Sequence, residues 1–217
     1  MMMSPESFYE IHCKGKSSDQ LYAVIRRLKR EIGKLKRICE HPEYECAVFP
    51  GEATRIACNR LYLEQAYRAL DELGEPYVPT AAERRAAALE DNLCHLQRLT
   101  FSMGGYFDGY KTYVAEVAED TVHIRTTHTF ADWYPSEEWQ QDGQTFLSDL
   151  AHLHLGEWRR RYDTRRFGYF ICDGFQWKLE LVFSDGTKTV KFYGDNAVPY
   201  NFEHLLTLVG WTEDPSC

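Results

Sequence analysis

No apolar run in the chain of 217 residues approaches the roughly 20 residues that a transmembrane helix needs. The N-terminal segment Met1–Pro5 is followed by polar residues and lacks the apolar core of a secretory signal. We therefore expect a cytoplasmic protein without membrane attachment. The seven cysteines are odd in number and scattered along the chain, which predicts free thiols rather than a disulfide framework.

The chain also lacks the common catalytic motifs. It has no P-loop, no dinucleotide-binding glycine pattern and no Ser/His/Asp or Cys/His signature. Asp108 and Asp173 each precede a glycine at the entry of an expected strand, where Asp-Gly is typical of a turn. The sequence therefore favours a non-enzymatic protein that needs no cofactor. The alternative is a metal-dependent hydrolase or nuclease that uses His and Asp residues of the expected sheet.

Charge is unevenly distributed along the chain. The first 100 residues carry 15 basic and 15 acidic side chains, whereas residues 101–217 carry 10 basic and 18 acidic ones. The second half therefore holds the whole net charge of −8. This asymmetry indicates electrostatic partners and bears on association rather than on the fold.

Apolar residues recur at helical spacing in the first half of the chain. A helix is predicted over residues 18–39, where an apolar seam with steps of four and three residues runs from Leu21 to Cys39. A second helix is predicted over residues 51–73. A heptad-like seam suits packing against another helix. Because that helix could belong to a second copy of the chain, the sequence does not determine the oligomeric state.

A third helix is predicted to begin at Thr80. Thr80 and Glu83 have the spacing of a capping box, and the apolar seam that follows reaches Leu96. Residues 1–102 are therefore expected to form a helical domain, organised as a helical hairpin or a three-helix unit.

In the second half the apolar period changes from about 3.6 residues to two, which is typical of strands. One hairpin is predicted from Asp108 to Phe130, with its turn at Glu119 and Asp120. A second is predicted from Asp173 to Tyr193. Four antiparallel strands with helices on one face would bury the apolar residues and leave a polar face exposed.

Each expected hairpin precedes a helical segment. Apolar residues from Phe146 to Trp158 indicate one helix, and Asn201 is suited to cap another. Residues 103–217 are therefore predicted to form a duplicated ββα domain. The predicted fold class of the whole chain is α+β.

Three short motifs in the last third of the chain carry a family resemblance. They are Trp158-x3-Tyr162, Asp173-Gly174-x-Gln176-Trp177 and Tyr193-Gly194-Asp195-Asn196-Ala197-x-Pro199-x-Asn201-Phe202. Together they resemble a pattern in uncharacterised proteins of gut Firmicutes and their mobile elements. The resemblance implies a bacterial or phage origin and carries no assigned activity.

The first long helix carries the main binding candidates. Residues 14–37 contain nine basic side chains against Asp19 and Glu31, and those after residue 25 avoid the apolar seam. Such a face would follow the phosphates of a nucleic acid. It would equally suit a solvated helix, or one that docks on the acidic second half. The candidates are Arg26, Arg27, Lys29, Arg30, Lys34, Lys36 and Arg37.

A second basic cluster lies amid Trp158, Tyr162 and Phe167. It consists of Arg159, Arg160, Arg161, Arg165 and Arg166, of which Arg160 and Arg161 are the binding candidates. Aromatic residues interleaved with arginines can stack on bases. They are also found at ordinary helix ends, where cations complement the helix dipole.

The segment 131–143 is too long for a tight connection and is predicted to be a functional loop. Exposed aromatic residues among carboxylates suit a protein-binding surface, one that could occupy a nucleic-acid channel by presenting negative charge. The candidates are Asp132, Trp133, Tyr134, Glu137, Glu138 and Trp139. The expected partner is a protein or a nucleoprotein. A mobile-element inhibitor of a bacterial nuclease, of the anti-CRISPR type, would suit these features.

The sequence also contains a weak pattern of possible metal ligands. Cys39, His41, Cys46 and Cys58 offer four zinc-type ligands around the end of the first long helix. Their spacing is not the usual paired pattern, and three ordinary thiols with a surface histidine are favoured instead. No metal is therefore predicted.

Overall fold

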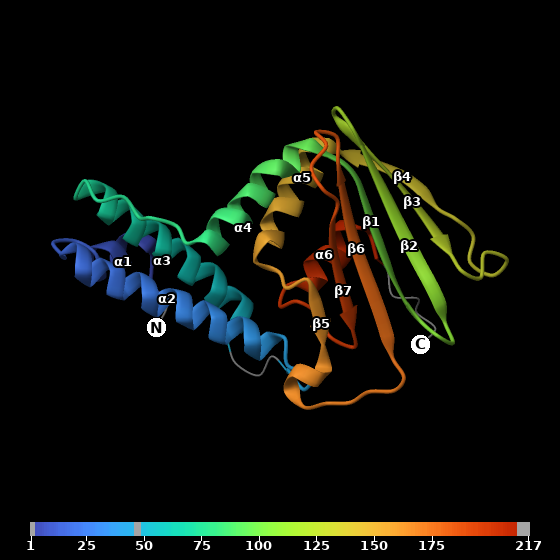
Figure 1. The fold of residues 1–217 in the computed structure, drawn as a ribbon, viewed down its shortest axis with the longest axis horizontal. Coiled ribbons are helices and arrows are strands. Elements are labelled where there is room, and N and C mark those ends of the chain that lie inside the picture. The colour runs from blue at the N-terminus through green and yellow to red at the C-terminus, as the bar shows by residue number, and fades with distance from the viewer. Residues whose placement is uncertain (1–2, 46–48, 212–217) are drawn as a thin grey trace. The chain divides into compact units, whose positions relative to one another are not determined.

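Helices build the first compact unit of the chain, Met1–Pro79, which we call unit 1 (Figure 1). The computed structural model describes residues 3–45 and 49–211. Unit 1 contains α1 (Pro5–His12), α2 (Ser18–Cys39) and α3 (Glu52–Glu72), and α2 packs along α3. The bounds of α2 and α3 agree with the predicted helices to within one residue.

The apolar seam of α2 explains why this helix forms and how it packs. The Ser17 hydroxyl accepts a hydrogen bond from the Gln20 amide, and the Gln20 side chain accepts one from the Ser17 amide. This capping box satisfies backbone groups that have no partner within the helix. The seam side chains are buried against the rest of unit 1: Leu21, Ile25, Leu28, Ile32 and Leu35.

Helix α1 is not predicted by the sequence pattern. Its eight residues are too few for a clear apolar period, although Ser4 caps it and Pro5 stands at its first position. Phe8 stacks on Tyr62 of α3 with ring centroids 4.3 Å apart. The Tyr62 hydroxyl donates a hydrogen bond to the Met3 carbonyl over 2.8 Å. Packing on α3 therefore holds α1 in place.

The second compact unit, Thr80–Cys217, which we call unit 2, begins with the predicted third helix. The predicted capping box of Thr80 and Glu83 is present at the start of α4 (Ala81–Asp91). The prediction that this helix continues to Leu96 is wrong. The 3-10 turn η1 (Asn92–His95) instead leads into β1 (Leu96–Gly105). The chain thus divides into compact units after Pro79, and α4 and most of β1 precede residue 103, the start of the predicted second domain.

Unit 2 contains a seven-stranded mixed sheet in the order β4-β3-β2-β1-β6-β7-β5, not the predicted four-stranded antiparallel one. The two predicted hairpins are present, and β1 joins them by pairing with β2 on one side and β6 on the other. The edge strand β5 runs parallel to β7. The strands are β2 (Gly109–Ala118), β3 (Thr121–His128), β4 (Glu138–Asp142), β5 (Arg161–Asp163), β6 (Phe175–Phe183) and β7 (Val190–Asp195).

The two hairpins each precede a helix, but the predicted duplication is not matched exactly. The first hairpin is followed by β4 and then α5 (Gly143–His152), whereas β7 leads to α6 (Phe202–Leu208). The predicted helix from Phe146 to Trp158 ends early, because His154 adopts a left-handed conformation with φ of 49°. The 3-10 turns η2 (Leu155–Glu157) and η3 (Thr164–Phe167) flank β5.

One face of the sheet is covered and the other is open. Helices α5 and α6 lie on the same side of the strands (Figure 1), and their apolar residues form one core with inward side chains such as Ile124 and Leu179. The alternate residues His123, Arg125 and Lys178 are exposed. The predicted polar sheet face is therefore present. None of the helices in the described ranges combines the length and apolar character that a bilayer crossing requires.

Candidate functional site

Five of the seven predicted cations of α2 are exposed on the side opposite its buried seam. We call these residues the α2 basic face: Arg26, Arg27, Arg30, Lys34 and Arg37. Within residues 3–45 and 49–211, none of the five forms an ion pair. Gly33 lies among them, and a Cβ at this position would meet no atom within 4 Å. The exposed cations therefore surround one position, Gly33, at which the helix backbone is not covered by a side chain.

The other two predicted cations are half-buried. Lys29 donates a hydrogen bond to the Tyr77 hydroxyl over 2.7 Å, and its ammonium group lies 4.1 Å from the centre of the Tyr77 ring. The Tyr67 ring lies 5.4 Å from the same nitrogen. Lys36 also has an interaction partner within the protein. Lys29 thus ties the segment after α3 to α2.

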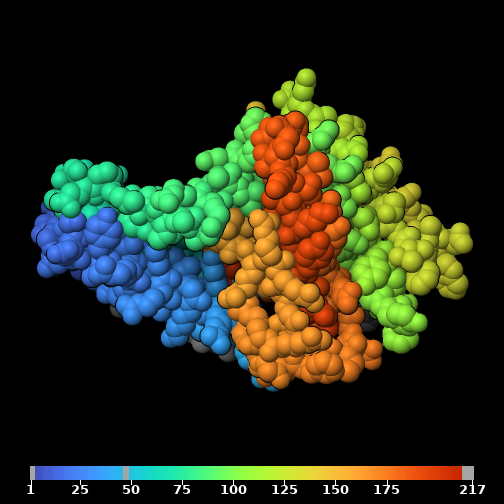
Figure 2. Space-filling model, viewed as in Figure 1, coloured from blue at the N-terminus to red at the C-terminus, as the bar shows by residue number. Residues whose placement is uncertain are grey.

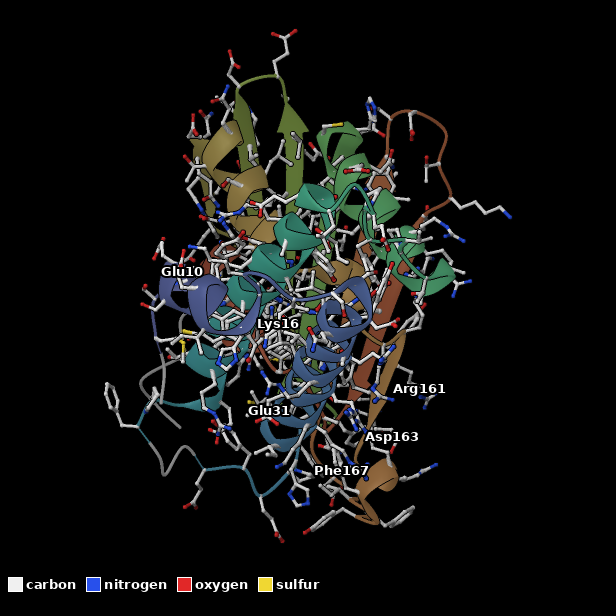
Figure 3. The ribbon with its side chains drawn as sticks, turned by 90° about the vertical axis from the view of Figure 1, so that its left-hand side faces the viewer. Glu10, Lys16, Glu31, Arg161, Asp163 and Phe167 are labelled. Carbon is white, nitrogen blue, oxygen red and sulfur yellow. The ribbon has the colours of Figure 1, made fainter. Side chains whose placement is uncertain are left out.

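Arg160 and Arg161 lie at the β5 edge of unit 2. The Arg160 guanidinium stands 4.9 Å from the centre of the Phe192 ring, and Arg161 is exposed beside Asp163 on the same strand (Figure 3). The flanking aromatic residues Trp158 and Tyr162 have only 6% and 1% of their surface exposed. These two rings belong to the core, so they cannot stack on bases as the sequence pattern suggests.

The motifs behind the family resemblance meet in that core. The Trp158 ring centroid lies 6.1 Å from that of Trp177, and the Trp177 centroid lies 4.9 Å from that of Phe202. The Trp158 indole donates to the Asn201 side chain over 3.0 Å, and the Trp177 indole donates to the Ala197 carbonyl over 2.8 Å. The motifs therefore describe a buried packing unit.

A turn joins the remaining motif residues. Asn196 has a positive φ of 51°, and its side-chain oxygen accepts a hydrogen bond from the Phe175 amide over 3.0 Å. A Cβ on Gly174 would lie only 1.7 Å from that oxygen. Asp173-Gly174 and Asn196 thus fit one another as structural elements at the end of the β6–β7 hairpin.

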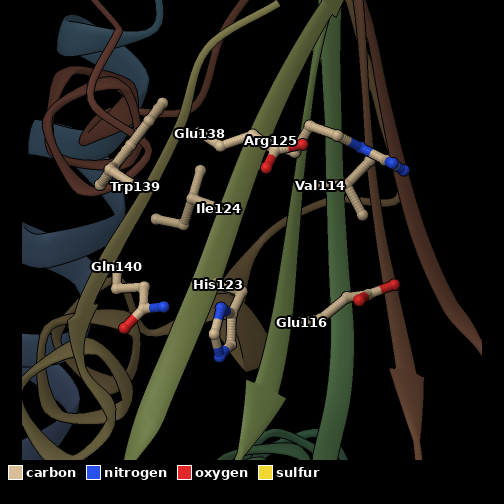
Figure 4. Close-up of a pocket in the computed structure, with 8 residues that line it drawn as sticks. All are labelled: Val114, Glu116, His123, Ile124, Arg125, Glu138, Trp139 and Gln140. Atoms are coloured by element: carbon tan, nitrogen blue, oxygen red, sulfur yellow. The ribbon is translucent and has the colours of Figure 1, made fainter.

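The open face of the sheet holds a shallow hollow of about 320 Å³ over β2, β3 and β4 (Figure 4). Cross-strand pairing places His123 between Glu116 and Gln140, and Arg125 between Val114 and Glu138. In Figure 4 the side chains of Arg125 and Glu116 lie on the opposite side of the strands from Ile124 and Trp139. The hollow offers polar groups of both signs in an exposed setting.

Further along the open face, Glu180 lies between two lysines. Its carboxylate is 2.7 Å from the Lys178 ammonium and 3.3 Å from that of Lys191. The Lys178 ammonium, and after it that of Lys191, holds the pKa of Glu180 below its usual value.

A Glu180→Gln variant is expected to lose this contribution, about 0.5–1 kcal/mol at neutral pH. Because the folded-state pKa of Glu180 is lowered, the contribution is present above the unfolded-state pKa, about 4.3. It is lost as the pH falls through the lower folded-state value. Urea unfolding of both proteins from pH 7 to pH 3 measures this. A difference between them that stays constant with pH would contradict the assignment.

The described residues do not assemble the weak candidate ligands for a metal. Cys39 and Cys58 are half-buried, and burial raises the pKa of the Cys39 thiol. The His41 ring nitrogen Nδ1 accepts a hydrogen bond from the Glu43 amide over 3.2 Å. Cys46 lies outside the described residues. Within the described ranges, no three His, Cys, Asp or Glu side chains are grouped so that they could hold a metal ion.

The predicted aromatic and acidic loop divides into two parts. Asp132, Trp133, Tyr134 and Glu137 are exposed in the segment between β3 and β4, and 84% of the Trp133 surface is open. The rest is β4, which the sequence does not predict. There Glu138 pairs with Arg125 of β3, and Trp139 packs 6.3 Å from the Tyr113 ring.

Comparisons of the chain with protein families, with curated proteins and with solved structures find no match.

Proposed function

We propose that the protein is a non-enzymatic binding protein that acts on a nucleic acid or on a protein that handles nucleic acid. The observation that supports this most is the α2 basic face, which gathers five exposed cations on one helix of a chain whose net charge is −8. Exposed cations without acidic partners attract phosphates, and their binding releases counterions. The α2 basic face is therefore proposed as the phosphate contact.

The dimensions of α2 suit this role. From Arg26 to Arg37 the helix rises about 16 Å. Duplex DNA carries one charge per about 1.7 Å of its axis, so phosphates are available to every cation of the face. Gly33 leaves room in the middle of the face for close approach of a nucleic-acid backbone. The contact would be independent of sequence, because it addresses phosphates rather than base edges.

The family resemblance supports a narrower form of the proposal. A mobile-element protein with a basic helix and an acidic second unit would suit an inhibitor of a bacterial nuclease, of the anti-CRISPR type. In that role the basic helix would contact guide RNA or DNA, and unit 2 would contact the nuclease itself. A pull-down from bacterial lysate with and without added nuclease separates a nucleic-acid bridge from a direct protein partner.

The charge-reversal variant Arg26→Glu/Arg30→Glu/Arg37→Glu is expected to bind a fluorescein-labelled nucleic acid at least about 100-fold more weakly than the wild type. The slope of log affinity against log salt should fall by about three, one for each lost phosphate contact. Fluorescence anisotropy over a salt series, with duplex DNA and single-stranded RNA as separate probes, measures both quantities.

The control is Lys14→Glu/Arg85→Glu/Lys188→Glu, which makes the same change of net charge at three scattered exposed positions. It should lower the affinity only slightly. Equal losses in the two variants would show that total charge, rather than the α2 basic face, determines binding. Unchanged affinity in the first variant would contradict the proposal. Stoichiometric metal in the purified protein, with a hydrolytic activity lost on chelation, would instead favour a metal-dependent hydrolase or nuclease.

A further inference from the structure

Three loops of unit 2 meet at one end of its sheet. They are residues 106–108 between β1 and β2, 129–137 between β3 and β4, and 164–174 between β5 and β6. The strand directions bring them to the same end (Figure 1). In Figure 2 the third loop reaches the surface in orange along the bottom of unit 2, and the first two reach it in green and yellow at the right.

Glycines allow the three loops to approach one another closely, because they carry no side chain at the points of contact. A Cβ on Gly105 would lie 2.9 Å from the Gly174 carbonyl oxygen, which joins the first loop to the third. A Cβ on Gly109 would lie 3.0 Å from the Phe130 ring, which joins the first loop to the second. We call the surface that these loops form the aromatic end.

Large apolar side chains at the aromatic end are exposed to solvent. Tyr106 is 90% exposed, Trp133 84% and Phe107 75%. Exposed apolar groups that lie together mark interaction surfaces, and tyrosine and tryptophan are the residues that contribute most to binding at such surfaces. The exposed members are Tyr106, Phe107, Phe130, Trp133, Tyr134, Phe170, Ile171 and Phe175.

Some rings at the aromatic end pack against neighbouring rings at the surface rather than against the core of unit 2. Tyr106 and Phe107 meet edge to face with centroids 5.2 Å apart. The Tyr134 ring lies 4.3 Å from that of His128 at the end of β3. Such contacts hold the side chains in position before a partner arrives, which lowers the entropic cost of binding.

Carboxylates outnumber cations in the three loops of the aromatic end. Residues 106–108, 129–137 and 164–174 contain Asp108, Asp132, Glu137 and Asp173 against Arg165 and Arg166. The Arg165 guanidinium stands 5.3 Å from the centre of the Phe170 ring and 3.9 Å from the Asp163 carboxylate. Arginine stacks on aromatic faces and pairs with carboxylates, whereas phosphates would be repelled.

We propose that the aromatic end is a docking surface for an arginine-rich segment of a partner protein. The surface belongs to unit 2 and shares no residue with the α2 basic face, so this inference goes beyond the proposed function and does not depend on it. The aromatic residues would supply the contact area and stack on guanidinium groups. The carboxylates would select basic segments over acidic ones and over nucleic acid.

The test uses the full chain and a labelled arginine-rich peptide that also contains leucine, with a peptide of matched length in which glutamate replaces arginine. Isothermal titration calorimetry at physiological salt is expected to show binding of the basic peptide alone. The variant Tyr106→Ser/Phe107→Ser/Trp133→Ser should weaken this binding at least about tenfold. Because these side chains are exposed, the variant should keep the thermal midpoint of the wild type.

A second pair of variants separates the local surface from the total charge. Asp108→Asn/Asp132→Asn/Asp173→Asn should weaken peptide binding roughly three- to tenfold. The control Glu119→Gln/Asp120→Asn/Glu203→Gln removes the same charge from exposed positions elsewhere in unit 2 and should leave binding almost unchanged.

Three results would overturn the inference. They are no binding of the basic peptide, equal losses in the two charge variants, and binding of single-stranded RNA that the aromatic substitutions abolish. The last would make the surface a platform for bases. Reversal of the α2 basic face should leave peptide binding intact, so failure of this inference and failure of the proposed function are distinguishable.

Discussion

Replacing Gly194 by alanine is expected to lower the free energy of unfolding of unit 2 by about 3 kcal/mol or more. Gly194 is a buried residue of β7, and a Cβ there would lie 1.8 Å from the indole nitrogen of Trp177. The same Cβ would lie 2.5 Å from the Ala197 carbonyl oxygen. These two atoms share the 2.8 Å hydrogen bond of the buried indole. The substitution therefore overpacks the core and breaks a buried hydrogen bond.

The position of the tryptophans makes this effect measurable in unit 2 alone. All five tryptophans of the chain follow residue 79 and thus belong to unit 2. Urea unfolding followed by tryptophan fluorescence should show the Gly194→Ala transition at a much lower urea concentration than that of the wild type, with a similar slope. An unchanged midpoint would show that the core can shift to accommodate the methyl group.

Gly33→Ala is the matched control, because it adds the same methyl group to a helical glycine with open space around it. Alanine loses less conformational entropy than glycine on forming a helix, so this variant should gain about 0.5–1 kcal/mol in unit 1. Far-UV circular dichroism, which follows the helices, should report the gain. The opposite signs at Gly33 and Gly194 separate the two causes, backbone entropy and steric fit.

Local patterns were sufficient to predict α2 and α3 of unit 1 and the two hairpins of unit 2. The bounds of α2 follow from a seam that repeats every three or four residues. The β2–β3 hairpin follows from alternating residues around Glu119, whose positive φ of 37° forms the turn. Both are set by neighbours in sequence.

Strand β1 escaped prediction for a specific reason. The register between β1 and β6 shifts between Leu96 and Arg98, so a bulge places Leu96 and Leu99 on the core side. These two leucines are three positions apart in sequence, a step that is typical of a helix and continues the seam of α4. The alternation resumes only with Leu99 and Phe101. Because β1 was missed, the sheet was predicted with four strands and without the strand that joins the two hairpins.

The two candidate surfaces also differ in how far they could be predicted from the sequence. The α2 basic face was predicted because it needs only the period of one helix. Of the aromatic end, the sequence predicted only the residues from Asp132 to Glu137, within the expected loop 131–143, because Tyr106 and Phe170 join them through the pairing of distant strands. Trp139, which the sequence placed in the loop, instead packs on the core. Sequence spacing does not reveal such tertiary contacts.

Asn201→Ala is expected to cost unit 2 about 2–4 kcal/mol. Asn201 stands at the start of α6, but its side chain makes no capping hydrogen bond with the helix. It instead accepts from the Trp158 indole over 3.0 Å and donates to the Leu153 carbonyl over 2.8 Å. Alanine would leave a buried donor and a buried acceptor without partners, and tryptophan fluorescence in urea would report the loss.

Asn201→Asp distinguishes the hydrogen bonds from the shape of the side chain. Aspartate keeps the acceptor for Trp158, but when ionised it places a negative charge against the Leu153 carbonyl. Burial should therefore raise the folded-state pKa of this carboxyl above its unfolded value of about 3.9. A raised folded-state pKa means that the variant loses stability as the pH rises. The penalty relative to the wild type should be largest at pH 7 and shrink toward pH 4, where the protonated carboxyl can donate to the carbonyl. A penalty that is independent of pH would mean that Asn201 acts through packing alone.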